Sequence, residues 1–382
     1  MLTTRKVLVV RNAFVYDFGG AERLAVDVAQ SAMHYGLKAT VVSCQPRLRA
    51  YSKAENVPTR KGIWWSQQNW SGWRVALFPV YLIWQVILFA WYVGVLLRER
   101  PQAVHILSKD DFIAGTLAAK LLGKRVVWTD CADLKYVYQN HGVWYKNPVG
   151  KLVFWAARFA DAVVLVSKSE QKLIEGQIGR SVPKNYCVIH ISAKQQDVVA
   201  KERAKADEHA VIFCATSRLV VAKGIGELVT AFNRLSAEKP GAYRLWVVGD
   251  GNDEAQFKKQ AGDNPDLVFV GHSDAPLAYV AASDLFVHPS HHEGFSLSIA
   301  EAAMLGKPMI VCDVGGNTEL VNSKNGAVIP AKDPESLYLA MKELGEDKQR
   351  RTALGKQARH DYQTLFDFDM LMRTKVIPLY EK

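Results

Sequence analysis

Residues 288–308, HPSHHEGFSLSIAEAAMLGKP, pass from the end of an apolar strand through a turn into a helix. The spacing of Ser298 and Glu301 has the form of a capping box, which predicts that the helix begins near Ser298. Glu293 then lies in the turn and Glu301 in the first turn of the helix. Ligands of parallel α/β sheets bind beyond the carboxyl ends of the strands. We therefore expect both carboxylates to face a ligand site.

The same alternation of strand and helix extends in both directions from this stretch. Short β-branched runs are each followed by a helical segment, which is the pattern of a parallel sheet with covering helices. It predicts an α/β protein with two doubly wound, Rossmann-like parallel-sheet domains that face a cleft. The expected strands lie at residues 6–10, 39–44, 103–107, 126–129, 162–166, 187–191, 211–215, 245–248, 267–270, 285–288 and 309–312.

A charged stretch at residues 194–209 separates the two series of strands and is interpreted as the connection between the domains. We expect an N-terminal domain over residues 1–193 and a C-terminal domain over residues 194–365. A C-terminal helix at residues 366–382 is expected to pack back on the N-terminal domain. Two domains suit a chain of 382 residues, because a single hydrophobic core rarely grows beyond about 250 to 300 residues.

A second chemical signal follows the predicted strand at 211–215. Arg218 and Lys223 lie in SRLVVAKG, residues 217–224, directly before a predicted helix. A guanidinium and an ammonium group beside the positive end of a helix form a good site for an anion such as a diphosphate. Paired glutamates alone would also suit a glycosidase, in which an acid and a nucleophile flank the scissile bond. The two cations instead favour a reaction in which negative charge develops on a phosphate leaving group.

Together these motifs resemble those of glycosyltransferase family 4: residues 293–308 resemble its E-x7-E signature and residues 217–224 its GRLxxxKG element. The resemblance implies a GT-B fold, retention of anomeric configuration, no metal ion or cofactor, and a UDP- or GDP-sugar as the donor substrate. It assigns catalytic roles to Glu293, Arg218 and Lys223. By their positions in the family's motifs, the residues expected to bind the donor are Gly19, Gly20, Gly249, Gly294, Phe295, Ser296, Leu297, Glu301, Gly316 and Asn317.

Two positions depart from the family pattern. Ser296 stands where glycine is usual, which narrows the backbone freedom of the loop and leaves the donor sugar open. Cys131 stands at or beside the position of a histidine that many relatives have near the reacting sugar, and Asp130 or Asp133 is the candidate to compensate on the acceptor side. A structural role for Cys131 is the alternative, because free cysteine is often a small buried hydrophobe.

Charge is divided unevenly along the chain. Residues 1–190 hold 25 Lys and Arg against 12 Asp and Glu, whereas residues 191–382 hold 23 against 26. The first half therefore suits an anionic partner such as a membrane surface, an acidic glycan or nucleic acid, and no nucleic-acid motif accompanies the charge. The five cysteines and the three histidines at 288–292 match no metal-ligand spacing, and no signal peptide is predicted. These patterns favour a cytoplasmic protein without a metal site.

The segment from residue 64 to residue 97 raises the question of a membrane. Its tryptophans lie among the basic residues Lys53, Arg60, Lys61 and Arg74, a combination that suits docking on an anionic bilayer. The expected membrane-facing residues are Trp64, Trp65, Trp70 and Trp73. Burial in the core or stacking on the acceptor is the alternative for these side chains. Residues 75–97 follow, with Gln85 as their single strongly polar side chain, and are long enough to span a bilayer. A buried helix is favoured, because spanning would separate strands of one sheet.

The sequence thus predicts a retaining hexosyltransferase that moves a sugar from a nucleotide-diphosphate donor to a lipid-linked or membrane-proximal glycan. The C-terminal domain would bind the donor and the N-terminal domain the acceptor. The protein is expected in the cytoplasm, peripheral on the inner face of the membrane, with no nucleic-acid partner. A nucleotide-sugar epimerase of the same architecture and a non-catalytic membrane-binding protein are the alternatives. A binding protein, however, has no use for two cations and two acids at the strand ends.

Overall fold

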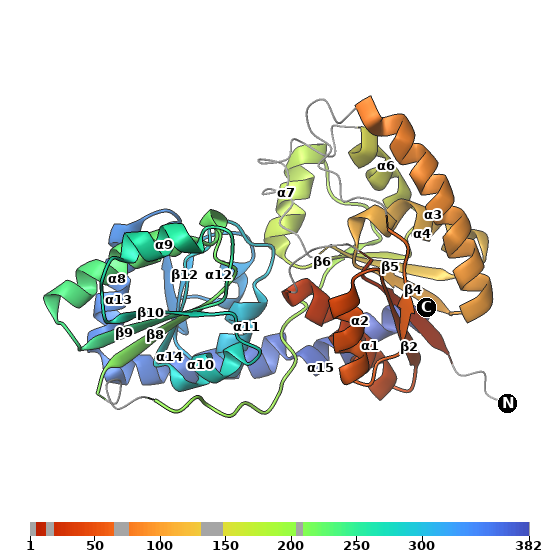
Figure 1. The fold of residues 1–382 in the computed structure, drawn as a ribbon. Coiled ribbons are helices and arrows are strands. Elements are labelled where there is room, and N and C mark those ends of the chain that lie inside the picture. The colour runs from red at the N-terminus through yellow and green to blue at the C-terminus, as the bar shows by residue number, and fades with distance from the viewer. Residues whose placement is uncertain (1–4, 13–18, 65–75, 131–147, 204–208, 382) are drawn as a thin grey trace. The chain divides into compact units, whose positions relative to one another are not determined.

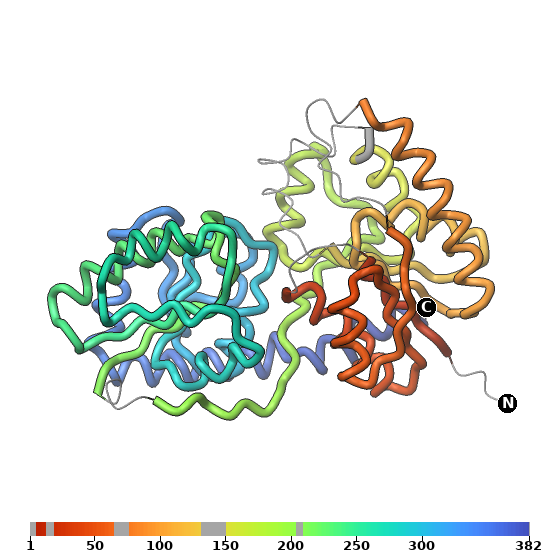
Figure 2. Tube along the Cα trace, in the orientation of Figure 1, coloured from red at the N-terminus to blue at the C-terminus, as the bar shows by residue number. Residues whose placement is uncertain are grey.

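The computed structural model describes residues 5–12, 19–64, 76–130, 148–203 and 209–381. The chain forms two compact units: the first comprises residues 1–190 and 369–382, and the second comprises residues 191–368. Each unit contains one parallel β-sheet covered by helices (Figures 1 and 2). The predicted fold class, an α/β protein with two Rossmann-like parallel-sheet domains, is confirmed.

The first unit contains seven strands in the order β3-β2-β1-β4-β5-β6-β7. All neighbouring pairs are parallel, and the central strands are buried along almost their whole length, as expected for a parallel sheet covered by helices. The chain reverses its direction across the sheet between β1 and β4. The strands are β1 (Lys6–Val10), β2 (Lys38–Ser43), β3 (Thr59–Lys61), β4 (Ala103–Ile106), β5 (Arg125–Asp130), β6 (Ala162–Leu165) and β7 (Tyr186–Val188).

Helices of the first unit follow the strands in alternation. Three of them, α3, α4 and α6, pack in sequence against one another and share a hydrophobic cluster with the sheet. This layer lies over β4 and β5 (Figure 1). The helices are α1 (Gly20–His34), α2 (Pro46–Ala54), α3 (Phe78–Glu99), α4 (Phe112–Leu121), α6 (Pro148–Ala157), α7 (Lys168–Ile178) and α16 (Ile377–Glu381), and a short 3-10 helix at Lys109–Asp111 precedes α4.

The last residues of the chain pack into the first unit. α16 contacts β5, and the ring of His105 joins the two elements, since its Nδ1 lies 2.6 Å from Tyr380 Oη and its Nε2 lies 2.7 Å from Thr129 Oγ1. Arg125 Nε also donates to the carbonyl oxygen of Leu379 over 2.9 Å. Burial lowers the pKa of His105 to about 3, so the ring is neutral at physiological pH.

The second unit contains six parallel strands in the order β10-β9-β8-β11-β12-β13. Successive side chains of β8 point to opposite faces, so Ile212 and Phe213 enter two different hydrophobic clusters. The direction of the chain across the sheet reverses between β8 and β11. The strands are β8 (Val211–Thr216), β9 (Tyr243–Val248), β10 (Leu267–Gly271), β11 (Leu285–His288), β12 (Met309–Cys312) and β13 (Gly326–Ile329).

Helices cover both faces of this second sheet. Side chains of α8, α9 and α13 form the cluster on one face, and side chains of α10, α11 and α14 contribute to the cluster on the other. The helices are α8 (Ile225–Glu238), α9 (Glu254–Ala261), α10 (Pro276–Ala282), α11 (Leu297–Met304), α12 (Asn317–Leu320), α13 (Pro334–Glu346) and α14 (Lys348–Asp361), with a short 3-10 helix at Val221–Lys223 before α8 and a short α15 (Phe368–Leu371) where the units meet in sequence.

Candidate functional site

Four loops of the second unit meet at the carboxyl edge of its sheet. They follow β8, β9, β11 and β12, and they carry most of the residues that the sequence singled out. β8 and β11 are neighbours, but the chain leaves them in opposite directions across the sheet. Ligands of doubly wound sheets bind at such a switch point, because the diverging loops leave room between them. This edge is therefore the candidate functional site of the second unit.

Glu293 and Lys223 meet at this switch point. Lys223 Nζ donates to Glu293 Oε1 over 2.5 Å, and His288 Nε2 lies 2.8 Å from the same oxygen. The side chains of Lys223 and Glu293 are 20% and 12% exposed. The structure thus brings one predicted cation into contact with one predicted acid. No role was predicted for His288, the last residue of β11, although its place at a strand end was a usable signal.

The pKa of Glu293 is lower than the ordinary value of a glutamate. Burial of the carboxyl group acts to raise this pKa, but the charge of Lys223 and the hydrogen bond with His288 lower it by more. The carboxylate therefore stays ionised throughout the physiological pH range. In this state it accepts hydrogen bonds and attracts cationic groups. It does not serve as a general acid near neutral pH.

Two glycines allow neighbouring loops to touch the loop of Glu293. Gly224 has a φ of +68°, and a Cβ atom there would lie 2.0 Å from the carbonyl oxygen of Pro289. Gly315 has a φ of +52°, and its Cβ atom would lie 1.7 Å from the carbonyl oxygen of Glu293. Both the left-handed conformation and the close approach require glycine. The loops after β8 and β12 therefore hold the Glu293 loop through direct backbone contact.

The loop after β9 packs in the same way against the loop of Arg218. Gly249 has a φ of +133°, and a Cβ atom there would lie 2.0 Å from the carbonyl oxygen of Ser217. The backbone N–H of Leu219 donates to the carbonyl oxygen of Asp250 over 2.7 Å. Gly249 thus lies beside Arg218, whose side chain is exposed. Both predicted phosphate-binding cations belong to the loop after β8 at this edge of the sheet.

The start of α11 differs from the prediction. Its N-cap is Ser296, whose Oγ accepts a hydrogen bond from the N–H of Ile299 over 3.4 Å. The capping box predicted from Ser298 and Glu301 is therefore wrong, because the extended backbone that a cap requires occurs at Ser296. Leu297 is the first helical residue, and Glu301 lies in the second turn with 5% of its surface exposed. The serine that replaces the usual glycine thus caps the helix.

The other predicted donor-binding residues of this half lie in the same two loops. The N–H of Gly316 donates to the carbonyl oxygen of Gly294 over 2.9 Å, which joins the loop after β12 to the loop of Glu293. Asn317 is buried, and its Nδ2 donates to the carbonyl oxygen of the last residue of β12. The ring of Phe295 stacks on Phe366, with 5.9 Å between centroids. Donor contacts of these residues stay a prediction.

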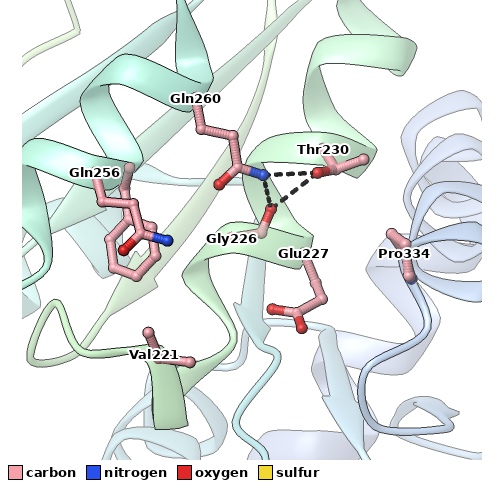
Figure 3. Close-up of a pocket in the computed structure, with 8 residues that line it drawn as sticks. Val221, Gly226, Glu227, Thr230, Gln256, Gln260 and Pro334 are labelled. Atoms are coloured by element: carbon pink, nitrogen blue, oxygen red, sulfur yellow. Dashed lines mark hydrogen bonds between the residues drawn. The ribbon is translucent and has the colours of Figure 1, made fainter.

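A pocket of about 260 Å³ lies at the start of α8 (Figure 3). Gln260 Nε2 donates to the carbonyl oxygen of Gly226 and to Thr230 Oγ1, each over 2.8 Å. Of the residues that line the pocket, Glu227 alone is charged, and a negative wall does not suit a diphosphate. The pocket is therefore not the candidate donor site. Glu227 Oε1 lies 3.1 Å from Nε2 of His291 in the Glu293 loop, so the two sites are neighbours.

In the first unit, the two predicted glycines lie at the start of α1. Gly19 is the N-cap and Gly20 the first residue of the helix. The N–H of Gly19 donates to Glu22 Oε2 over 3.1 Å, and Arg11 donates twice to Glu22 Oε1. The positive end of α1 thus lies against a carboxylate that is paired with a guanidinium. A donor contact of Gly19 and Gly20 stays a prediction.

Asp130 and Trp64 are the described members of the predicted acceptor and membrane sets. Asp130 ends β5 and is 8% exposed, and its Oδ1 lies 3.3 Å from Lys109 Nζ. Trp64 is 36% exposed. The roles assigned to these sets stay predictions. The members that lie outside the described residues are Cys131, Asp133, Trp65, Trp70 and Trp73.

A polar cluster at the switch point of the first sheet was missed by the sequence analysis. Asp111 Oδ1 accepts hydrogen bonds from Asn12 Nδ2 over 3.2 Å and from Tyr92 Oη over 2.6 Å, and Asp111 Oδ2 accepts one from Ser108 Oγ over 2.5 Å. Burial raises the pKa of Asp110 to about 7 and the pKa of Asp111 to about 6. The run SKDD, residues 108–111, directly follows a buried strand, and this position was the available signal.

Two family models match the chain in succession. The model of Glycosyltransferase Family 4 matches residues 18–191, and the model of Glycosyl transferases group 1 matches residues 198–361. The chain belongs to glycosyltransferase family 4. The family, its GT-B fold and its retaining class, which the sequence motifs predicted, are confirmed.

Known proteins of the family resemble this chain at moderate identity. An uncharacterised glycosyltransferase of Methanocaldococcus jannaschii is 29% identical over 56% of this chain and 56% of its own length. A GDP-mannose-dependent monoacylated alpha-(1-6)-phosphatidylinositol monomannoside mannosyltransferase of Corynebacterium glutamicum is 28% identical over 47% of this chain and 49% of its own. The chain thus spans about half the length of the curated relatives it matches.

A solved structure extends the similarity to the whole fold. The crystal structure of HepE from Anabaena in complex with UDP-glucose superposes with a TM-score of 0.77 and covers 99% of this chain and 100% of that chain, at 19% identity. At this identity the likeness shows the GT-B fold alone.

Both matching models describe glycosyltransferases, which is the class of enzyme that the sequence motifs predicted. Family 4 enzymes use UDP- or GDP-sugars without a metal cofactor. Among the residues that the structure describes, no cluster of three or more His, Cys, Asp or Glu side chains could hold a metal ion.

Proposed function

We propose that this family 4 protein is a retaining hexosyltransferase that moves a sugar from a UDP- or GDP-sugar to a lipid-linked or membrane-proximal glycan. The observation that carries the proposal is the contact of Lys223 with Glu293 at the switch point of the second sheet. The ammonium group suits the donor diphosphate, and the ionised carboxylate suits the hydroxyl groups of a sugar. In this proposal the C-terminal half binds the donor and the N-terminal half binds the acceptor.

The charges of the site favour the departure of a nucleoside diphosphate. Cleavage of the bond between the anomeric carbon and the phosphate oxygen leaves negative charge on the phosphate. Arg218 and Lys223 would stabilise this charge as it develops in the transition state. Lys223 Nζ carries three N–H bonds, so it can donate to Glu293 and to a phosphate oxygen at the same time.

Retention requires no covalent intermediate with the enzyme in this proposal. The acceptor hydroxyl attacks the anomeric carbon from the face that the diphosphate leaves, and the departing phosphate oxygen takes the hydroxyl proton. Glu293 is a poor candidate for a nucleophile, because Lys223 and His288 hold its negative charge. Its proposed role is to accept hydrogen bonds from the donor sugar.

A membrane-proximal acceptor is supported by three observations. Lys and Arg exceed Asp and Glu by 25 to 12 over residues 1–190, which favours an anionic surface. The relative in Corynebacterium glutamicum carries the name of an enzyme that acts on a phosphatidylinositol monomannoside. The described part of the chain contains one helix, α3, that is long and apolar enough to cross a membrane. These observations support a cytoplasmic protein that is peripheral on the inner face of the membrane.

Binding of nucleotide sugars tests the donor part of the proposal. Purified protein is screened against UDP- and GDP-sugars by saturation-transfer NMR and thermal shift. We expect one nucleotide to bind, and we expect Lys223→Ala to weaken that binding while the control Lys258→Ala, on the surface of α9, does not. Failure of every nucleotide sugar to bind would overturn the proposal.

Product analysis separates the proposed function from its alternatives. A transferase consumes the donor and releases a nucleoside diphosphate in proportion to the glycosylated acceptor. An epimerase changes the sugar of the donor and releases no nucleoside diphosphate. A non-catalytic membrane-binding protein does neither. Glycolipid extracts serve as the acceptor pool, and the product is identified by mass spectrometry.

A further inference from the structure

Helix α3 has one buried face and one exposed face, and both are largely apolar. The buried residues recur at helical spacing and are Tyr81, Gln85, Leu88, Tyr92, Val95 and Leu96. The large hydrophobic residues exposed on the helix are Val80, Leu82, Ile83, Val86, Ile87 and Leu97, called here the outer face of α3. From Phe78 to Leu97 the helix contains no charged residue. A surface helix of a globular protein normally turns a polar face to water, so this outer face is unusual.

The buried face fixes α3 to the first unit through hydrogen bonds. Gln85 Nε2 donates to the carbonyl oxygen of Asp110 over 3.1 Å, and Gln85 Oε1 accepts from the N–H of Ala114 over 3.2 Å. Tyr92 Oη donates to Asp111 Oδ1 over 2.6 Å. Transfer of α3 into a bilayer as a spanning helix would break all three bonds and leave polar groups in lipid. We therefore expect α3 to stay packed against the first unit rather than to span a bilayer.

Exposed hydrophobic side chains concentrate in the layer that contains α3. Nine of the seventeen large hydrophobic residues that are exposed in the described part of the chain lie in α3, α4 or α6 or in the turn after α6. Besides the outer face of α3, they are Leu121, Trp155 and Phe159. The rings of Trp155 and Phe159 pack edge to face, 4.9 Å apart. The three helices pack in sequence against one another on one face of the sheet (Figure 1).

Most charges of this layer are positive, although Lys120 is paired with Asp161, which lies between α6 and β6. Glu99 is the single acid within the described residues of α3, α4 and α6, and it is paired with Lys6 and Arg60. Exposed basic residues border the apolar side chains, namely Arg98, Lys120, Lys151 and Arg158. Lys151 and Trp155 of α6, and Arg158 directly after it, follow one another at helical spacing. Basic residues beside interfacial aromatics are typical of contact with anionic lipid headgroups.

We propose that the outer face of α3, with the exposed side of α6, docks on an anionic lipid bilayer, and that α3 lies in the plane of the interface. Lipid is favoured over a protein partner because the outer face offers no hydrogen-bonding side chain, whereas protein interfaces carry about ten hydrogen bonds. Acyl chains require none, and the basic border suits the headgroups. This docking surface goes beyond the proposed function. Lipid binding itself does not depend on that function, but the purpose that we assign to it, access to a membrane-proximal acceptor, does.

Vesicle flotation with matched variants tests the surface. The full chain is mixed at low salt with phosphatidylglycerol–phosphatidylcholine vesicles or with phosphatidylcholine vesicles alone. We expect binding to the anionic vesicles, and we expect the triple variant Ile83→Ser, Val86→Ser, Ile87→Ser to bind about tenfold or more weakly, since each side chain loses apolar area for lipid. The control Val199→Ser, Leu339→Ser, Leu365→Ser removes three exposed hydrophobic side chains of the second unit and should bind as the wild type does.

Charge and extraction test the mode of docking. Lys151→Glu with Arg158→Glu should weaken binding to anionic vesicles and leave binding to neutral vesicles unchanged. Alkaline carbonate should release the protein from membranes, as it does for proteins that lie in the interface. A protein that remains with the pellet after carbonate would overturn the in-plane arrangement.

Three results would overturn the surface itself. They are absence of flotation with anionic vesicles, equal flotation of the Ser triple variant and the wild type, and a dimer that this variant converts to a monomer without any lipid binding. The Ser triple variant should melt as the wild type does and should bind the nucleotide sugar with unchanged affinity. Loss of nucleotide binding in the wild type would instead contradict the proposed function, so the two failures are distinguishable.

Discussion

At the scale of single residues, Glu293 is the centre of the candidate donor site. Its carboxylate contacts Lys223 and His288, and its backbone carbonyl contacts Gly315. The side chain and the backbone of the same residue are therefore both fixed, the first by charge and the second by close packing. A fixed acceptor for sugar hydroxyl groups needs no rearrangement when the donor binds, and such preorganisation lowers the cost of binding.

Removal of the ammonium group should slow transfer. Lys223→Ala is expected to lower kcat by about tenfold or more, because it removes a charge that stabilises the leaving diphosphate. Arg218→Ala should have an effect of similar size. The measurement is the release of nucleoside diphosphate at saturating donor. Lys258→Ala is the control, and wild-type turnover in both cation variants would contradict the clamp.

Glu293→Gln should change the dependence of stability on pH. The pKa of Glu293 is lower in the folded chain than the value of about 4.3 expected when unfolded, so its charge stabilises the fold above that value. This stabilisation is lost as the pH falls through the folded pKa. Urea unfolding should therefore show a wild-type advantage over the variant at pH 7 that shrinks below about pH 4. An advantage independent of pH would contradict the ionised pair.

A methyl group at Gly315 should disrupt the site. Gly315→Ala is expected to destabilise the second unit and abolish donor binding, because the Cβ atom would overlap the carbonyl of Glu293. The matched control is Gly179→Ala, where the backbone is left-handed with a φ of +69° and no atom lies within 4 Å of the new Cβ. The control should lose only about 1 kcal/mol of unfolding free energy from backbone strain. Thermal shift with and without nucleotide compares the two variants.

At the scale of elements, the N-cap of α11 distinguishes two serines. Ser296→Ala should lower the unfolding free energy by about 1 kcal/mol, and Ser296→Gly by a few tenths, since glycine is tolerated at this position. Ser298→Ala should have little effect, because Ser298 does not cap the helix. Denaturant unfolding of the three variants checks the order. A larger loss for Ser298→Ala would reverse the assignment.

The strands and most helices could be predicted from the sequence, whereas caps and two short strands could not. Parallel strands covered on both faces are continuous apolar runs, and those runs are visible in β1, β8 and β12. β3 is a polar run of three residues, Thr59–Lys61, and β13 begins with a glycine, so neither has that signal. Ser296 and Ser298 both fit the composition of a cap, and only the backbone conformation decides between them.

The meeting of the loops at the candidate donor site could be predicted because their motifs are local, whereas the polar cluster of the first sheet depends on distant partners. Asn12, Tyr92 and Asp111 come from three separate parts of the chain and meet only when β1 and β4 become neighbours. No spacing in the sequence marks them as a group. The same reason applies to α3, where composition predicts an apolar helix but only packing shows which side is buried.

At the scale of the whole molecule, each unit depends on elements that are distant in sequence. His105 in the first unit contacts Tyr380, which lies 275 residues further along the chain. The pKa of His105 is about 3 in the folded chain, below the value near 6.5 expected when unfolded. The neutral ring therefore stabilises the fold above about pH 6.5, and this contribution is lost as the pH falls toward the folded pKa.

His105→Gln should make the first unit less sensitive to acid. Wild-type protein is expected to lose unfolding free energy between about pH 6.5 and pH 4.5 with a steeper slope than the variant, since only the wild type has this buried imidazole. His272→Gln, at an exposed position, is the control and should keep the wild-type slope. Hydrogen exchange should place the difference in β4, β5 and α16. Equal slopes for wild type and His105→Gln would contradict the buried neutral ring.

The close contacts at Gly224 and Gly315 bear on how this site could be exchanged with that of another enzyme. Because the carbonyl of Glu293 touches Gly315 and the carbonyl of Pro289 touches Gly224, a transplanted motif would meet backbone shaped for a different neighbour. A chimera that swaps residues 293–301 alone should misfit its surroundings. A graft of the whole segment 289–316 together with the turn at 221–224 keeps these backbone contacts. It is therefore the smallest part of the candidate donor site that we expect to transfer intact into another enzyme.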